Sequence, residues 1–343
     1  MPYDLITMGR VGVDLYPEQI GVPLAQVRTF AKSLGGSATN VAVAAARLGA
    51  RAAVITKVGD DPFGPYVRGA LRGFGVDDAY VGTHPALRTP VVFCEIFPPD
   101  DFPLLFYREP TAPDITIASD ELDLDAIHAA RVFWTTGTGL SAEPSRSATL
   151  AALAARERPS REAGRRPSVS ERGAGRLAEG PITVHDLDHR PMFWDDESEA
   201  GRWARAALAH ATVAVGNRDE AAVPTGTRDP EEAAEALLEL GVELAIVKRG
   251  PEGVLARTRE ERVEVAPVPV EVVNGLGAGD AFGGALVHGL LHDWPLERTI
   301  RLANAAGSFV AGQLACADAM PTLEDLDEIA LRGVGAASPG ARA

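Results

Sequence analysis

The chain has 343 residues, 46 % of them apolar, and its 33 basic and 48 acidic side chains give a formal charge of −15. This length allows a large buried core, and the acidic balance argues against a nucleic-acid partner, because binding phosphates needs a basic face. Two cysteines exclude a disulfide framework and a cysteine-rich zinc module. The N-terminus lacks a secretory signal pattern and no stretch approaches the roughly 18 apolar residues of a membrane span, so we expect a cytoplasmic protein without a membrane partner.

Short β-type runs recur along the chain, with helical patterns between many of them. The clearest helix is predicted over residues 230–240, where Asp229 is the N-cap, Pro230 takes the first position and Gly241 ends the pattern. Repeated strand–helix–strand order implies parallel strands covered on both faces, so the sequence predicts an α/β fold with a doubly wound, mostly parallel sheet. The predicted strands are residues 5–8, 52–58, 132–136, 182–187, 212–215 and 244–248.

Two further β-rich runs, residues 89–97 and 104–107, interrupt this alternation. Residues 13–33 are rich in Pro and Gly and are expected to be irregular. We interpret the ranges 13–33 and 86–110 as a small β lid over the ends of the core strands.

Residues 156–180 contain seven arginines and few large apolar side chains. Such a segment buries too little surface to offset its ordering entropy, so a disordered insertion is predicted, with a basic patch for an anionic partner as the alternative. Residues 336–343 are expected to form a disordered tail. The remainder of residues 1–335 is then one domain with its lid.

The most specific motif is GLGAGDAFGG at residues 275–284, which follows the β-type run 268–273 and opens a helical pattern. Backbone N–H groups at such a junction lack helical partners and the helix dipole adds positive potential, so an anion is expected there. The spacing fits neither a dinucleotide fingerprint nor a Walker A loop. Asp280 would repel a phosphate unless it accepts the proton of a hydroxyl that attacks the γ-phosphate, while the amides of Gly277, Ala278 and Gly279 stabilise the transferred charge. The alternative is that Asp280 merely caps the helix.

A second motif, GGSATN, occupies residues 35–40. Gly36 lets a ligand approach the backbone, Ser37 can cap the following helix, and Asn40 offers both a donor and an acceptor, as sugar hydroxyls require. Taken alone this motif is weak, because a Gly-Gly start to an alanine-rich helix is common.

The two motifs in this order resemble the PfkB, or ribokinase-like, family of carbohydrate kinases, and the resemblance covers nearly the whole chain. Other stretches follow in family order: Asp14 after the first strand, GDDPFG at 59–64, NRDE at 217–220, VKRGPEGV at 247–254 and ANAAGS at 303–308. Within the family, FYREPTAPD, DLDHRPMFW and CADAMPT resemble the 5-dehydro-2-deoxygluconokinases of myo-inositol breakdown. Kinases of fructose and of 2-keto-3-deoxygluconate share parts of this pattern and stay as alternatives.

The resemblance implies an ATP- and Mg²⁺-dependent kinase that phosphorylates the terminal primary hydroxyl of a small sugar acid, and a homodimer formed through the lid. It assigns Asp280 as the general base, Gly277–Gly279 as the anion hole, and Asp14, Gly36 and Asn40 as contacts of sugar hydroxyls. Asn217 and Glu220 match the N-x-x-E element, in which Glu220 positions Mg²⁺ through water. Nucleotide contacts are expected at Lys248, Gly250, Gly253 and Asn304, although Asn304 is interpreted equally well as a helix-packing residue.

A sugar acid needs a cationic partner, and with three lysines in the chain an arginine is expected. Arg108, after the second lid run, and Arg190, after a core strand, are the candidates, and either could instead pair with a local acid, Glu109 or Asp188.

Asn274 and Leu276 stand where the family usually has Asp and Thr, which puts its monovalent-cation site in doubt. Two other classes compete with a kinase. A nicotinamide dehydrogenase is disfavoured by the failed fingerprint, and a catalytically silent sugar sensor by the retained Asp280.

Overall fold

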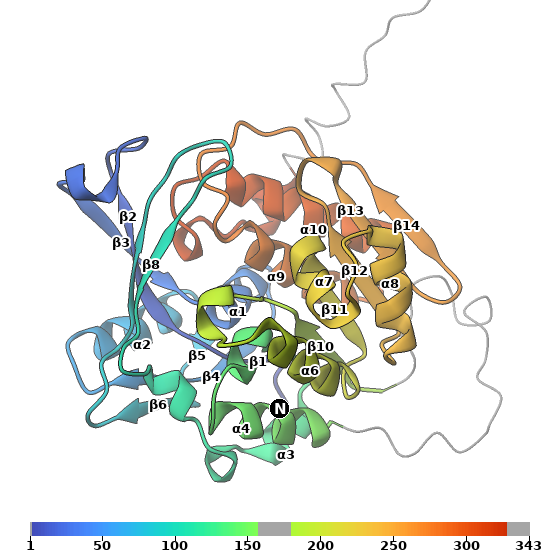
Figure 1. The fold of residues 1–343 in the computed structure, drawn as a ribbon, viewed down its shortest axis with the longest axis horizontal. Coiled ribbons are helices and arrows are strands. Elements are labelled where there is room, and N and C mark those ends of the chain that lie inside the picture. Colours follow the sequence, from blue (N-terminus) through green and yellow to red (C-terminus); the bar gives the residue numbers. More distant parts are fainter. Residues whose placement is uncertain (1, 157–179, 328–343) are drawn as a thin grey trace, which may run out of the picture.

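The computed structural model describes residues 2–156 and 180–327. A ten-stranded sheet runs through its centre (Figure 1) in the order β14-β13-β12-β11-β10-β9-β1-β4-β5, with β6 also paired to β4. The strands from β12 to β5 pair in parallel, and β13 and β14 extend one edge as antiparallel strands. The strands are β1 (Leu5–Met8), β4 (Ala52–Gly59), β5 (Val76–Asp77), β6 (Val81–His84), β9 (Val132–Thr136), β10 (Ile182–Asp186), β11 (Val213–Asn217), β12 (Leu244–Lys248), β13 (Val254–Arg257) and β14 (Arg262–Val265).

Helices cover both faces of this sheet, so the predicted α/β class is confirmed. Alternate strand residues face opposite ways: Leu5 packs with α1, α9 and α10, whereas Ile6 packs with α3 and α4. A third apolar cluster joins α6, α7 and α8 to the β11–β13 end of the sheet. The helices are α1 (Ser37–Arg47), α2 (Phe63–Gly73), α3 (Leu124–Ala129), α4 (Ser145–Ala154), α6 (Glu197–Leu208), α7 (Arg218–Thr225), α8 (Pro230–Glu239), α9 (Ala278–Leu291) and α10 (Leu296–Ala311).

Local sequence signals place several elements correctly. β1, β9 and β12 have the predicted bounds, and α8 begins where the pattern indicates. The carboxylate of Asp229 accepts hydrogen bonds from the backbone N–H groups of Glu231 and Glu232, each at 3.0 Å. This N-cap satisfies two amides that have no partner within the helix.

A four-stranded sheet, β3-β2-β7-β8, stands beside the main sheet (Figure 1). Its strands are β2 (Gly12–Pro17), β3 (Phe30–Gly35), β7 (Val91–Cys94) and β8 (Leu104–Tyr107). The expectation that residues 13–33 are irregular is wrong for 13–17 and 30–33, because β2 and β3 pair along six residues each, and the segment between them, 18–29, forms no strand. That this sheet acts as a lid stays a prediction.

The prediction of β structure for the run 268–273 is also wrong, since residues 266–275 form no strand. Pro267 and Pro269 lack the N–H groups that a ladder needs. The segment is attached instead by the amides of Val273 and Asn274, which both donate to the carbonyl of Ala311 at 2.9 and 3.1 Å.

The predicted insertion at 156–180 and the predicted tail at 336–343 fall outside the described residues, apart from residues 156 and 180. No helix within residues 2–156 and 180–327 is long and apolar enough to cross a membrane.

Candidate active site

A cavity of about 380 Å³, part of it open to solvent, lies where the four-stranded sheet faces the carboxyl ends of β1 and β10. In the main sheet β1 lies between β4, on the side of one edge, and β9, followed by β10, on the side of the other edge. The order of the strands therefore reverses beside β1, and α/β sheets bind ligands at such a switch point. The cavity brings together the predicted residues Asp14, Gly36, Asn40, Arg190, Gly277 and Asp280. It also includes Arg10, Tyr16, Ser37 and Cys316, which sequence reasoning had not assigned to a site.

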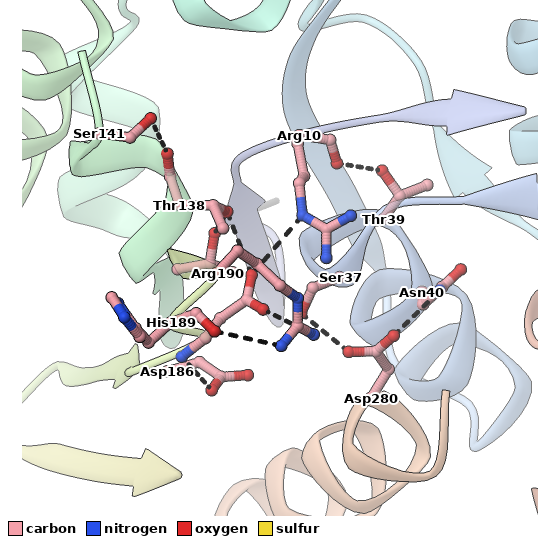
Figure 2. A network of polar contacts seen from close by, with 12 residues as sticks. Arg10, Ser37, Thr39, Asn40, Thr138, Ser141, Asp186, His189, Arg190 and Asp280 are labelled. Carbon is pink, nitrogen blue, oxygen red and sulfur yellow. Dashed lines mark hydrogen bonds and ion pairs between the residues drawn. The ribbon is translucent and has the colours of Figure 1, made fainter. Parts of the chain in front are cut away.

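Asp280 lies in the first turn of α9, and both of its carboxylate oxygens accept hydrogen bonds from α1 (Figure 2). Ser37 Oγ donates to Oδ1 and Asn40 Nδ2 donates to Oδ2, each at 2.8 Å. Burial raises the pKa of Asp280 above its usual value, although these two donors oppose the shift. Asp280 is therefore an oriented carboxylate with raised basicity. Its two oxygens accept hydrogen bonds from α1 and do not cap its own helix, α9.

Ser37 has a different task from the predicted one. Gly36, with φ +106°, is the N-cap of α1, and Ser37 is the first helical residue, whose hydroxyl reaches Asp280 instead of the helix amides. The single sequence signal that could have found it was its place inside GGSATN, opposite the acid of GAGD.

The anion-binding turn is formed at the start of α9. Gly277 has φ +80°, and a Cβ there would approach Cys316 Sγ to 2.5 Å, so only glycine fits. Ala278 and Gly279 follow as the first helical residues with free amides. Lys248 Nζ lies 3.1 Å from where a Cβ on Gly279 would be, which places an ammonium beside these amides. The turn and Lys248 together form a cationic pole suited to a phosphate.

Asp14 reaches the cavity from β2. Tyr16 Oη donates a 3.0 Å hydrogen bond to Asp14 Oδ2 and lies 2.8 Å from Cys316 Sγ. Burial raises the pKa of Asp14 from 3.8 to about 6, although Arg10 and the Tyr16 hydrogen bond oppose this shift. An acceptor that binds a proton this readily is suited to a ligand hydroxyl.

Asp188 follows β10 and lies between two arginines. Arg190 Nη2 is 3.1 Å from Oδ1 and Arg10 Nε is 3.7 Å from Oδ2, while Thr138 Oγ1 donates to Oδ2 at 3.1 Å. Burial alone would raise the pKa of Asp188, but the two arginines and Thr138 lower it below its usual value. Its φ of +23° is uncommon for a residue with a side chain, and such strain is typical of functional sites.

Asp186 is the last residue of β10, and its pKa is shifted in the opposite direction to that of Asp188. Burial raises its pKa from 3.8 to about 8, even though the nearby Lys248 acts to lower it. Burial lowers the pKa of Lys248 in turn, but Asp186, Glu220 and Asp280 raise it above its usual value. These groups form a second charged cluster on the side of the cavity nearer to α7.

Asn217 and Glu220 form a reciprocal capping box at the start of α7. The amide of Glu220 donates to Asn217 Oδ1 at 2.9 Å, and the amide of Asn217 donates to Glu220 Oε2 at 2.7 Å. Glu220 Oε1 lies 3.6 Å from Arg190 Nη1. The N-x-x-E element therefore builds the helix end and also adds a carboxylate to the second cluster.

Other predicted residues lie away from the cavity. Arg108 Nη2 donates a 2.7 Å hydrogen bond to the buried Asp114, an acid that sequence reasoning did not consider as its partner. Gly250 and Gly253, with φ +58° and +84°, form the turn between β12 and β13. Asn304 Nδ2 donates to the carbonyl of Ala266 at 2.8 Å, which ties α10 to the segment after β14.

Asn274 is fully buried and supports the turn before α9. Its Nδ2 donates to the Leu314 carbonyl at 2.7 Å, and its Oδ1 accepts from the Leu276 amide at 3.0 Å. Asn274 here is a structural link rather than a charged cation ligand.

Comparisons with known proteins agree with this geometry. The pattern of the pfkB family carbohydrate kinases matches residues 4–164 and 182–323, and the chain belongs to this family. A 5-dehydro-2-deoxygluconokinase of Geobacillus kaustophilus is 31 % identical over 333 residues, covering 95 % of this chain and 93 % of that protein. The enzyme of the same name from Photobacterium profundum is 32 % identical over 332 residues, with coverage of 95 % and 94 %.

Solved structures share the fold. Fructokinase from Vibrio cholerae O395, with fructose, ADP and calcium ion bound, has a TM-score of 0.78 and 26 % identity, covering 95 % of this chain and 99 % of that one. A provisionally assigned ribokinase II from E. coli in complex with ATP and Mg²⁺ has a TM-score of 0.82 at 23 % identity, with coverage of 96 % and 99 %.

The raised pKa of Asp14 predicts that this proposed sugar contact lowers the stability of the folded protein at neutral pH. Between about pH 4 and about pH 6 the folded chain retains a proton that the unfolded chain has lost, so the free energy of unfolding falls as pH rises through this window. Asp14→Asn cannot ionise, and we expect its melting temperature to exceed that of the wild type by roughly 5 °C at pH 7.5. The difference should vanish near pH 4 in thermal melts, and a gain of equal size at both pH values would contradict this explanation.

Proposed function

We propose that this chain transfers the γ-phosphate of ATP to the terminal primary hydroxyl of 5-dehydro-2-deoxy-D-gluconate, giving the 6-phosphate and ADP, in myo-inositol degradation. The observation that carries this proposal is Asp280, oriented through both oxygens by Ser37 and Asn40 beside the amide-lined turn. The name shared by the two relatives that match 95 % of the chain supports the choice of acceptor.

In the proposed reaction the acceptor hydroxyl lies against Asp280 and the γ-phosphate against the start of α9. Asp280 accepts the hydroxyl proton as the new O–P bond forms and the bond to the β-phosphate oxygen breaks. The amides of Gly277, Ala278 and Gly279 and the ammonium of Lys248 stabilise charge on the transferred oxygens. Asp14 and the unpaired, buried Oδ1 of Asn40 accept hydrogen bonds from other hydroxyls of the sugar.

The residues present fit Mg²⁺ bound together with ATP. Asp186 and Glu220 are buried carboxylates beside Lys248, and burial raises the pKa of Asp186 even against this one ammonium, so a further cation would be accommodated there. Mg²⁺ retains most of its waters and needs only one or two protein carboxylates in addition to phosphate oxygens. When bound, it neutralises charge on the β- and γ-phosphates. We keep Gly250, Gly253 and Asn304 as proposed nucleotide contacts.

A coupled assay of ADP release with Mg-ATP tests the acceptor. The wild type is expected to prefer 5-dehydro-2-deoxygluconate over 2-keto-3-deoxygluconate, fructose and ribose in kcat/KM. A preference for 2-keto-3-deoxygluconate or fructose would retain the kinase mechanism and replace the acceptor. Absence of ADP with all four sugars would favour a sensor that binds sugar without turnover.

The role of Asp280 is tested by Asp280→Asn, which preserves the size of the side chain but replaces one acceptor oxygen by an NH₂ donor and removes the base. We expect kcat to fall by about 10² to 10⁴ while the melting temperature changes little. Asp125→Asn, on the exposed surface of α3, is the matched control and should retain wild-type kcat. Turnover of folded Asp280→Asn within a few-fold of the wild type would exclude Asp280 as the base.

We also propose that the chain forms a homodimer through the outer face of the four-stranded sheet. Phe93 contacts both Phe30 and Tyr107 there with ring centroids 5.4 Å apart, and Tyr107 and the neighbouring Leu105 are 60 % and 47 % exposed. A cluster of exposed aromatic and aliphatic side chains is typical of an interface.

Sedimentation analysis tests the dimer. The wild type should sediment as a dimer at micromolar concentration, and Tyr107→Asp should shift it to a monomer because the new charge would be buried between the copies. Leu124→Asp changes an exposed apolar residue of α3 and should leave the dimer intact. A wild type that is monomeric throughout would refute this assembly.

A further inference from the structure

Arg10 is a cation in the cavity that the preceding mechanism does not use. It follows β1, and only 11 % of its side chain is exposed. Its nearest recorded partner is Asp188, at an ion-pair distance of 3.7 Å, and its buried Nε makes no hydrogen bond. Within residues 2–156 and 180–327, no group accepts a hydrogen bond from its guanidinium. A buried guanidinium with open donors is costly unless a ligand completes it.

The other arginines considered for an acidic ligand are already engaged. Arg108 donates to Asp114 at 2.7 Å and does not line the cavity. Arg190 contacts two carboxylates, those of Asp188 and Glu220, and also donates to the His189 carbonyl. Arg10 is therefore the cavity arginine with the most unused hydrogen-bonding capacity.

The backbone around Arg10 places its side chain on the sugar side of the cavity. Its carbonyl accepts a 3.2 Å hydrogen bond from Thr39 Oγ1 and packs against Gly36, where a Cβ would overlap with it. The guanidinium extends toward Ser37 and Arg190 (Figure 2), and its carbon lies 5.9 Å from the centre of the Phe106 ring on β8. Arg10 also lowers the pKa of Asp14, the proposed sugar contact.

The cations of the site are thus divided between its two ends. Lys248 is beside the amides of α9, and Arg190 is beside Glu220, so both belong with the phosphates. Asp14 and Asp280 make the sugar end acidic, and a carboxylate could enter there only against a cation. Arg10 and Arg190 both line the cavity with Asp14 and Asp280, and Arg10 is the one of the two that has no contact with Glu220.

We propose that Arg10 binds the carboxylate of the sugar acid and thereby sets the preference for acids over neutral sugars. This inference rests on the proposed function and assigns to Arg10 the role that the sequence alone suggested for Arg108 or Arg190. A planar guanidinium with free N–H groups can bind a carboxylate through two parallel hydrogen bonds, which an ammonium cannot reproduce.

The test compares 5-dehydro-2-deoxygluconate with its primary amide, which has the same carbon chain without the charge. In Arg10→Gln we expect KM for the acid to rise about 10- to 100-fold, while KM for the amide and KM for ATP stay within about threefold. Arg10→Lys should recover only part of the loss. Arg72→Gln, an exposed arginine of α2 outside the cavity, is the matched control and should behave as the wild type.

The outcomes separate this inference from the proposed function. A wild type that phosphorylates the acid, with an Arg10→Gln variant whose KM for the acid is unchanged, keeps the function and overturns the role of Arg10. A rise in KM for ATP alone would assign Arg10 to the phosphates, and a rise for the acid in Arg108→Gln but not in Arg10→Gln would assign the carboxylate to Arg108. A wild type whose kcat/KM for the amide equals that for the acid would overturn carboxylate recognition itself, whereas a wild type that phosphorylates neither would overturn the proposed function. Thermal melts identify any variant that fails to fold, and Arg10→Lys then decides.

Discussion

The position of Asp280 depends on how closely α9 packs against α1. Two adjacent glycines of α9 make this approach possible: a Cβ on Gly284 would overlap with Ala44 of α1, and one on Gly283 would come within 3.1 Å of Val41 of α1. At this separation the short side chains of Ser37 and Asn40 reach both oxygens of Asp280. A larger residue at Gly284 would force the helices apart and break these hydrogen bonds while leaving the sheet intact. Helix packing in the core thus determines the geometry of the proposed base.

The cavity and the charged groups beside it concentrate charge in a region poorly accessible to water. Asp14, Asp186, Asp188 and Asp280 face Arg10, Arg190 and Lys248, so acids outnumber bases among these described side chains. Burial raises the pKa of Asp186 despite the nearby Lys248, whereas Asp188, between two arginines, has a lowered pKa and stays ionised. Because acids outnumber bases here, a polyphosphate is expected to bind only together with a further cation. This expectation agrees with the proposed use of Mg-ATP.

Much of the fold could be predicted from the sequence because its signals are local. Capping at Asp229 and apolar runs such as 244–248 depend on neighbouring residues, and the structure confirms them. The glycine motifs 35–40 and 275–284 also led to the family, since each must occupy a helix start. Pairing across the chain could not be predicted in this way. The Arg108–Asp114 pair and the Ser37–Asp280 hydrogen bond depend on tertiary packing, and Arg10 is a single residue with no motif of its own.

The contact between Tyr16 and Cys316 joins segments 300 residues apart in the sequence. Asp14 and Tyr16 leave the ribosome well before Gly277, Asp280 and Cys316, yet all of them line one cavity. The nascent chain can therefore pair β1 with β4 early, but it cannot complete its binding site until the segment that contains Cys316 has emerged. Until then the polar cavity side of β2 has neither a ligand nor a partner helix.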